Sequence, residues 1–208
     1  MTVTIVGRTS SHFTRVARIF AHELAVPYDL EVVSDLTSLD AAAYGGHPAL
    51  KVPTLRVESS VVFGTENICR KLSEHAGRQN DPRIVWPEHL SFDEARSAQE
   101  LTWHAMAAHV ELITGIMFAK LPEDSAYFVK LRAGMSGALS WLEANMTRVL
   151  EQLPRPRDVS LFEVTTFCLV DHLSFRRTLD PPPIPHLRAF AAEFSRRPSA
   201  RETEYVFR

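Results

Sequence analysis

Two short stretches of the chain combine residue types that can recognise a peptide-like ligand. Pro53 stands where a strand would begin, and a proline cannot donate a hydrogen bond to a strand ladder. A cis peptide bond before Pro53 would turn the backbone N–H and carbonyl of Val52 outward, where an antiparallel peptide can pair with them. Glu66 and Asn67 follow at the predicted start of a helix. Open N–H groups there bind a carboxylate and the Glu66 side chain can hold an ammonium, which favours a ligand with an amino-acid head and a peptide middle.

The composition is that of an ordinary globular protein. The 208 residues carry a net charge of −2, with 45% hydrophobic and 23% charged residues, so nothing points to nucleic acid or an anionic membrane as a partner. No apolar run approaches the roughly 20 residues that span a bilayer, and the N-terminus lacks the features of a signal peptide. Two cysteines, Cys69 and Cys168, lie in apolar surroundings. We therefore expect a cytoplasmic protein with buried thiols.

The first third of the chain alternates strand and helix patterns. Short β-branched or apolar stretches predict strands over residues 2–6 and 28–33 and a hairpin over residues 53–64. Apolar residues at helical spacing predict helices over residues 11–24 and 65–77. The order β-α-β followed by β-β-α predicts a parallel βαβ unit joined to an antiparallel hairpin.

The rest of the chain has a helical pattern. Long apolar stripes run through residues 91–153. Ser160 and Glu163 have the spacing of a capping box at the start of a further helix. We therefore predict three parts: an α/β domain (residues 1–78), a polar linker (residues 79–90) and an all-helical domain (residues 91–208).

The stretches HPALKVPTL, TENICRKL, SLFEV and RPSARETE resemble, in order and spacing, motifs of the glutathione transferases. The resemblance covers nearly the whole chain and implies an α/β thioredoxin-like N-terminal domain, an all-α C-terminal domain and a homodimer. It also implies that Val52, beside cis Pro53, pairs with the cysteinyl backbone of glutathione. Glu66 and Asn67 would hold the γ-glutamyl head, although the family usually has serine where this chain has Asn67. Lys51 would either meet the glycyl carboxylate or remain in solvent.

The same resemblance implies that a hydroxyl near the start of the first helix stabilises the glutathione thiolate. Ser11, His12 and Phe13 align with the family's Cys-Pro-Phe or Ser-Pro-Phe. We therefore predict Ser11 as the catalytic hydrogen-bond donor, with Ser10 as the alternative one position away. Serine is also a preferred N-cap residue, so either hydroxyl could serve only to cap the helix. No cysteine lies in this stretch, which disfavours glutaredoxin-like thiol exchange.

One long helix of the second half carries residues that suit a substrate pocket. Trp103, Met106 and His109 lie on the helix that lines the electrophile pocket in the family, and we predict that they contact the second substrate. Side chains of these types at helical spacing are equally often core residues. His104 and His109 are five positions apart, about 140° around a helix, so they cannot readily share a metal ion. We expect no metal site and glutathione as the co-substrate.

The predicted protein is a glutathione transferase-like enzyme that acts on a small hydrophobic electrophile. Its chemistry would come from thiolate stabilisation and proximity. Two alternatives remain open: a glutathione-dependent isomerase or peroxidase on the same fold, and a binding or scaffold protein without turnover. The departures from the family pattern at His12 and Asn67 keep the second alternative open.

Overall fold

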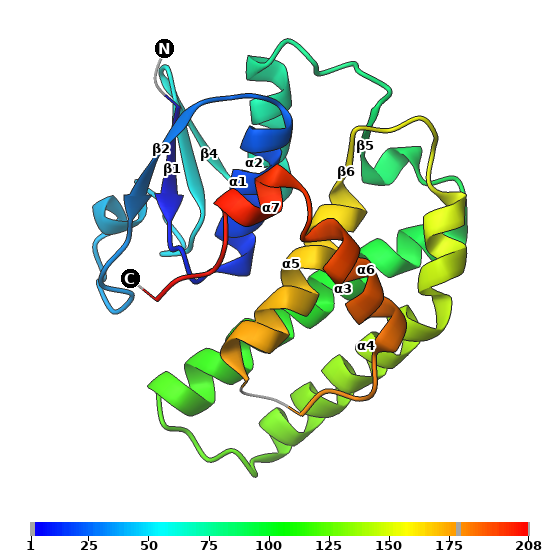
Figure 1. The fold of residues 1–208 in the computed structure, drawn as a ribbon. Coiled ribbons are helices and arrows are strands. Elements are labelled where there is room, and N and C mark those ends of the chain that lie inside the picture. The colour runs from blue at the N-terminus through cyan, green and yellow to red at the C-terminus, as the bar shows by residue number, and fades with distance from the viewer. Residues whose placement is uncertain (1–2, 178–179, 208) are drawn as a thin grey trace. The chain divides into compact units, whose positions relative to one another are not determined.

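The computed structural model describes residues 3–177 and 180–207, which form two compact units (Figure 1). Unit 1 consists of Met1–Ile84 together with Ser195–Arg208, and unit 2 consists of Val85–Phe194. Among the described residues, no helix is both long enough and apolar enough to cross a bilayer.

Unit 1 contains a four-stranded sheet with the order β2-β1-β3-β4. β1 and β2 are parallel and are joined by α1 (His12–Glu23), whereas β3 is antiparallel to both of its neighbours, β1 and β4. This arrangement confirms the predicted βαβ unit with an added hairpin, although Thr2 of the first predicted strand lies outside the described residues. The strands are β1 (Val3–Gly7), β2 (Tyr28–Val32), β3 (Thr54–Val57) and β4 (Ser60–Phe63).

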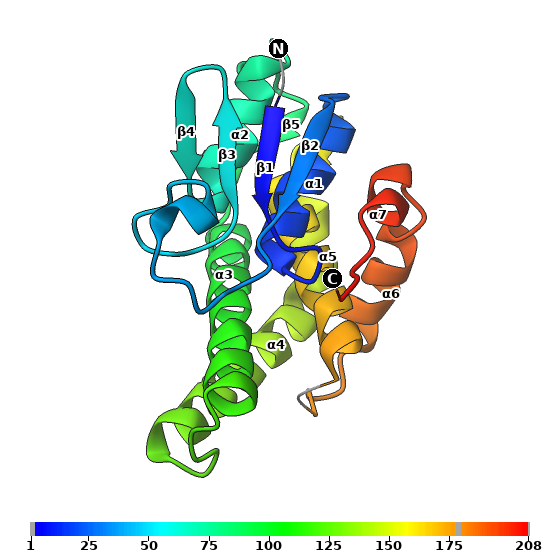
Figure 2. The same ribbon diagram turned by 90° about the vertical axis from the view of Figure 1, so that its left-hand side faces the viewer.

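α1 and α2 (Thr65–His75) lie side by side on one face of the sheet (Figure 2). Each helix repeats apolar residues three and four positions apart, so one side of each helix is buried. The fully buried side chains include Ile19 and Phe20 of α1 and Ile68 and Leu72 of α2. This packing fixes the N-terminal ends of both helices relative to the sheet.

The chain between β2 and β3 is anchored by Tyr44, at the end of the short 3-10 helix η1 (Ala41–Tyr44). The ring of Tyr44 packs with Val6 in a buried cluster, and Val52 packs against that cluster. The Oγ1 of Thr54 donates a buried hydrogen bond to the Tyr44 carbonyl at 2.8 Å. These contacts hold the residues that precede β3 in one place.

The C-terminal residues Ser195–Arg208 pack in unit 1, which corrects the predicted extent of the helical domain. α7 (Pro198–Glu202) lies beside α1, as the red and blue helices of Figure 1 show. The physical reason is a set of polar partners on α1. Glu23, at its end, accepts two hydrogen bonds from the Arg197 guanidinium at 2.8 and 2.7 Å.

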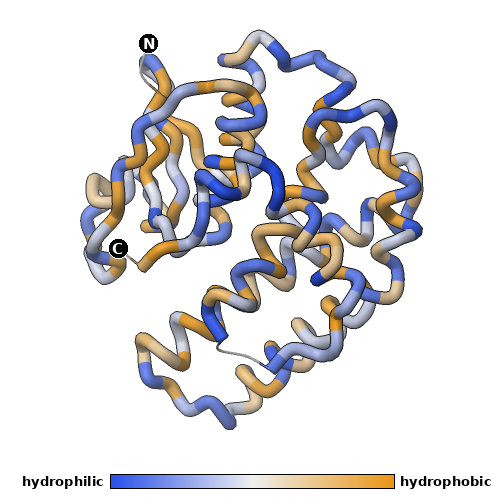
Figure 3. Tube along the Cα trace, viewed as in Figure 1, coloured by the Kyte–Doolittle hydropathy of each residue, from blue (hydrophilic) through white to orange (hydrophobic). Residues whose placement is uncertain are grey.

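Unit 2 is mainly helical, which confirms the predicted all-α part of the fold. α3 and α4 pack along each other, and hydrophobic residues recur at intervals along the helices (Figure 3). α5 is the most enclosed, with 11 buried residues among its 16. The described helical elements of unit 2 are η2 (Pro87–His89), α3 (Asp93–Leu112), the π-helical η3 (Ile113–Phe118), α4 (Ala126–Gln152), α5 (Leu161–Arg176) and α6 (Pro185–Phe194).

The start of α5 differs in detail from the predicted capping box. Two short strands also occur: β5 (Ile84–Val85), at the boundary of the units, and β6 (Val159–Ser160), directly before α5. Ser160 is the N-cap residue, but its hydroxyl makes no capping hydrogen bond. Glu163 instead accepts two hydrogen bonds from Arg157, both at 2.8 Å. The guanidinium competes successfully because its bidentate, charge-assisted pairing is stronger than a single backbone contact.

Candidate functional site

The backbone of Val52 is left open at the end of a strand. The Val52–Pro53 peptide bond is cis, as predicted. β3 begins its pairing at Thr54, which lies opposite Val6 of β1 and Phe63 of β4, so Val52 stands outside both ladders. Among the described residues, neither the N–H nor the carbonyl of Val52 has a hydrogen-bond partner. These two groups can therefore pair with an extended peptide, as in recognition by strand addition.

The first turn of α2 is open as well. Its N-cap residue is Gly64, with φ of +85°, and it supplies no side-chain cap. The first hydrogen bond of the helix runs from the Ile68 N–H to the Gly64 carbonyl at 2.9 Å. The N–H groups of Thr65, Glu66 and Asn67 therefore lie outside the helix's own hydrogen bonds. Such a turn binds a carboxylate through these donors and the helix dipole.

The side chains of this turn are oriented by neighbours. The Glu66 carboxylate accepts hydrogen bonds from Arg70 at 2.9 and 2.7 Å, and both side chains are about one-third exposed. The amide of Asn67 donates to the Phe63 carbonyl at 3.1 Å. A carboxylate has acceptor capacity beyond one partner, so Glu66 can still receive an ammonium group. Arg70 and Phe63 were not identified from sequence as part of this region.

The start of α1 differs from that of α2, because a side chain caps it. Ser11 is the N-cap residue, and its Oγ accepts a hydrogen bond from the Thr14 N–H at 3.2 Å. The capping role, the alternative to a catalytic one, is thus confirmed for Ser11. The two roles are compatible, because a hydroxyl that accepts one hydrogen bond still has its own proton to donate. Ser10 is buried in the turn just before the helix.

A histidine and a lysine lie just before the open backbone of Val52. Lys51 is exposed. The His47 ring lies 4.6 Å from the Phe63 ring, and its Nδ1 accepts a hydrogen bond from the Ala49 N–H. Partial burial and, second, the charge of Lys51 lower the pKa of His47. The lowered pKa favours the neutral form of the His47 imidazole.

The predicted substrate-contact residues of α3 are mostly enclosed. Met106 and His109 are buried, and Trp103 is half-buried. A cavity of about 410 Å³ lies between α3 and α4, and none of these three residues lines it. Substrate contact by Trp103, Met106 and His109 therefore stays a prediction. The residues around this cavity include Leu101, His104, Ala108, Tyr127, Leu131 and Met135.

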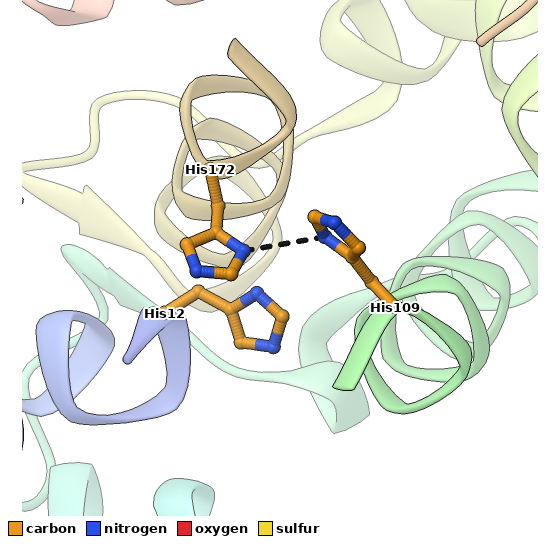
Figure 4. A group of neighbouring side chains, drawn as sticks. All are labelled: His12, His109 and His172. Atoms are coloured by element: carbon orange, nitrogen blue, oxygen red, sulfur yellow. Dashed lines mark hydrogen bonds between the residues drawn. The ribbon is translucent and has the colours of Figure 1, made fainter. Parts of the chain in front are cut away.

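His109 has a partner that sequence reasoning missed, His172 of α5. The two Nδ1 atoms are 3.2 Å apart, as the dashed line of Figure 4 marks. Burial, and second the charge of Arg176, lower the pKa of His109 to about 4, so the His109 imidazole is neutral at physiological pH.

Comparisons with known proteins agree with this fold. The family model described as "Glutathione S-transferase, N-terminal domain" matches residues 10–75. A search of curated proteins gave no match. Many solved structures share the fold. A glutathione S-transferase of Methylobacterium radiotolerans, in complex with glutathione sulfonate, has 19% identity and a TM-score of 0.78, covering 100% of this chain and 97% of that one.

Two further bacterial structures are equally similar. A glutathione S-transferase of Methylobacillus flagellatus with glutathione bound has 20% identity and a TM-score of 0.77, covering 98% of this chain and 100% of that one. A glutathione transferase family member of Pseudomonas fluorescens, also with bound glutathione, has 22% identity and a TM-score of 0.76, covering 99% and 100%. The chain thus has the glutathione transferase fold. The match of residues 10–75 to the glutathione S-transferase N-terminal domain model confirms the predicted resemblance.

Proposed function

We propose that this protein is a glutathione transferase-like enzyme that conjugates glutathione to a small, electrophilic, apolar substrate. The observation that carries the proposal is the pair of open recognition elements in unit 1. These are the unpaired backbone of Val52 and the uncapped first turn of α2. The similar structures with bound glutathione or glutathione sulfonate support the same ligand.

Each part of glutathione has a proposed partner. The backbone of Val52 pairs with the cysteinyl residue, next to Pro53. The N–H groups of the α2 first turn receive the γ-glutamyl carboxylate, and the Glu66 carboxylate receives its ammonium group. Asn67 contributes its backbone N–H, while its side-chain amide is held by the Phe63 carbonyl. Lys51 is positioned in sequence to meet the glycyl carboxylate.

The proposed chemistry begins with ionisation of the bound thiol. A free thiol has a pKa of about 8.5, and lowering it by about 2 units corresponds to roughly 2.7 kcal/mol in favour of the anion. The Ser11 hydroxyl donates a hydrogen bond to the sulfur, with Ser10 as the alternative donor, and the α1 dipole adds to the effect. The thiolate then attacks the electrophile: a carbon–sulfur bond forms, the leaving group departs with its electron pair, and the thiol proton has gone to water.

The apolar co-substrate contacts the helical part of the protein, and Trp103, Met106 and His109 remain its proposed contacts. Catalysis needs thiolate stabilisation and proximity, and glutathione is the co-substrate. We further propose that the protein is cytoplasmic and forms a homodimer.

A second candidate function is glutathione binding without turnover. The observation that favours it is that the Ser11 hydroxyl already serves α1 as a cap. In this alternative Ser11 would stabilise the helix without contacting the thiol. Both candidates bind the glutathione backbone in the same way. They differ in the pKa of the bound thiol, which only the enzyme lowers.

The test is a titration of the ultraviolet absorbance of bound glutathione thiolate. We expect a thiol pKa below the free value in the wild type, and a rise of about 1–2 units in Ser11→Ala. The matched control is Ser125→Ala, because Ser125 caps α4 through the Phe128 N–H. Both substitutions remove a cap worth about 1 kcal/mol, but only the first should move the thiol pKa.

The outcomes separate the candidates. A thiol pKa that moves in Ser10→Ala and not in Ser11→Ala assigns the donor to Ser10. Glutathione binding with an unshifted thiol pKa in the wild type favours the binding protein. Absence of glutathione binding in the wild type contradicts both candidates.

A further inference from the structure

The C-terminal segment, Ser195–Phe207, contacts the turn that carries Ser10 and Ser11. Thr9, which is buried, donates a hydrogen bond through Oγ1 to the Val206 carbonyl at 2.8 Å. The Val206 N–H in turn donates to the Thr9 carbonyl at 3.4 Å. Two hydrogen bonds between residues 197 positions apart therefore hold the residue that immediately precedes Ser10.

A buried arginine on α1 holds the same segment a few residues earlier. The Arg15 side chain is 2% exposed. Its Nη2 donates to the Ala200 carbonyl at 3.1 Å and its Nε donates to the Thr203 hydroxyl at 3.4 Å. Its guanidinium carbon lies 4.2 Å from the centre of the Tyr205 ring, within the range of a cation–π contact. A buried guanidinium requires such partners, so Arg15 and the segment stabilise each other's position.

Arg15 is also directly connected to the candidate thiol donor. Its backbone N–H donates to the Ser11 carbonyl at 3.0 Å, in the first hydrogen bond of α1. Thr9 and Arg15 thus bracket Ser10 and Ser11 on both sides in sequence. The C-terminal segment contacts both Thr9 and Arg15, so its position is coupled to the positions of the Ser10 and Ser11 hydroxyls.

A second anchor of the segment lies at the other end of α1. Glu23 is bound by Arg197 and by the Ser199 hydroxyl. It lies eight residues after Arg15, or about 12 Å along a helix with 1.5 Å rise per residue. This anchor holds the beginning of the segment and does not contact the Ser10–Ser11 turn. It therefore offers a matched control.

We propose that residues Thr203–Phe207 form part of the thiol site, and that Thr9 and Arg15 are the positioning residues through which they hold Ser10 and Ser11. The proposal rests on the proposed function, since it concerns the same thiolate. A hydrogen bond to sulfur weakens steeply when its donor is displaced or misaligned. Loosening the segment should therefore raise the pKa of the bound thiol while leaving the Val52 and α2 recognition elements in place.

The principal test compares Thr9→Val with the wild type. Valine keeps the shape of threonine and removes only the hydroxyl that donates to Val206. We expect the pKa of bound glutathione to rise by about half a unit to one unit. Because one unit is tenfold in ionisation, kcat/KM below that pKa should fall about three- to tenfold. It should return to the wild-type value at alkaline pH, and glutathione affinity measured below the pKa of the bound thiol, where the ligand binds protonated, should be unchanged.

Two companion variants test the same contact from the other side. Deleting residues 204–208 removes Tyr205 and Val206, and should raise the thiol pKa at least as much as Thr9→Val. Arg15→Lys keeps the charge and loses the planar fork of donors, and should give a shift in the same direction. The control Glu23→Gln weakens the Arg197 anchor and should lower thermal stability without moving the thiol pKa.

Amide hydrogen exchange tests the coupling without glutathione. Amides of residues 10–15 should exchange faster in Thr9→Val and in the truncated chain, and at the wild-type rate in Glu23→Gln. If the wild type does not bind glutathione, the proposed function fails, but this exchange pattern still decides whether the segment holds the turn. Unchanged exchange and thiol pKa in both variants, or an equal effect of Glu23→Gln, would overturn the positioning role.

Discussion

The backbone groups at the candidate site of unit 1 and the buried side chains between α3 and α5 of unit 2 differ in whether they have hydrogen-bond partners. In unit 1, the Val52 backbone and the first turn of α2 are left open within the described part of the chain. In unit 2, buried polar side chains of α3 are paired with α5: His109 lies against His172, and Gln99 donates to Thr165. The unpaired backbone groups of unit 1 are available for ligand recognition, whereas the paired side chains between α3 and α5 hold the two helices together.

This difference has a consequence for His109, which the sequence offered as a substrate contact. A group that recognises a ligand needs acceptor or donor capacity facing that ligand. The Nδ1 of His109 instead lies within hydrogen-bonding distance of His172. The structure therefore supports a structural role for this ring nitrogen, and the predictions below ask whether each unit behaves as its polar groups imply.

The largest expected effect is the loss of stability in acid that follows from His109. Its pKa is about 4 in the folded chain, compared with about 6.5 in an unfolded one. The unfolded state therefore binds more protons between these values, so stability falls as the pH falls from about 6.5 to about 4. A difference of about 2.5 units corresponds to about 3 kcal/mol. Urea unfolding at pH 7 and pH 4 measures this loss.

The variant that isolates this contribution is His109→Asn, which keeps a polar group near the position of Nδ1 but does not titrate. Its free energy of unfolding should decline less between pH 7 and pH 4 than that of the wild type, by about the same 3 kcal/mol. His104→Asn is the matched control, because His104 is exposed on the same helix. Equal acid sensitivity of wild type and His109→Asn would contradict the claim that His109 is the source of the stability lost in acid.

The next effect concerns the open turn of unit 1. Gly64→Ala places a Cβ at φ of +85°, 3.3 Å from the Asn67 amide nitrogen. This sparsely populated positive-φ conformation costs an L-residue about 1–3 kcal/mol, and displacement of the turn should also weaken glutathione binding. The control is Gly137→Ala, inside α4, where an added Cβ meets nothing within 4 Å. That change should stabilise the protein by about 0.5–1 kcal/mol.

These two glycine variants have opposite expected signs, so chemical unfolding together with glutathione calorimetry separates them. Loss of both stability and affinity in Gly64→Ala, with neither loss in Gly137→Ala, supports the open turn as the binding element. Full glutathione affinity in Gly64→Ala would separate the turn from recognition.

The parts of the site that could be predicted from sequence are those encoded within a few neighbouring residues. Pro53 marked the cis bond before β3, and Ser11 marked the start of α1, because prolines and N-cap residues act on the backbone beside them. The order of strands and helices likewise followed from local apolar periodicity. Local chemistry was sufficient for these features.

The missed features all depend on distant residues. His172 lies 63 positions from His109, and Thr203 lies 188 positions from Arg15. No local pattern marks such partners, because helix packing brings them together. For the same reason, the sequence predicts that the C-terminal stretch belongs to the helical domain. Its neighbours in sequence are helical, whereas its polar partners are on α1.

The smallest expected effect tests whether the closed groups of unit 2 add stability at all. The Gln99 side chain donates to Thr165 at 3.1 Å, but its Oε1 is buried without a partner among the described residues. Thr165 also donates to the Leu161 carbonyl at 2.8 Å. Gln99→Leu would remove one hydrogen bond worth about 1 kcal/mol and also an unsatisfied buried oxygen of similar cost.

The two contributions nearly cancel, so the free energy of unfolding of Gln99→Leu should lie within about 1 kcal/mol of the wild type. Gln99→Glu provides the contrast, because it would bury a carboxylate beside the same threonine and should destabilise by several kcal/mol. A large loss in Gln99→Leu would mean that Oε1 has a partner, such as an ordered water, that must be broken. The polar side chains between α3 and α5 would then stabilise the fold. They would differ from the unpaired backbone groups of unit 1 only in binding protein or water where those groups bind a ligand.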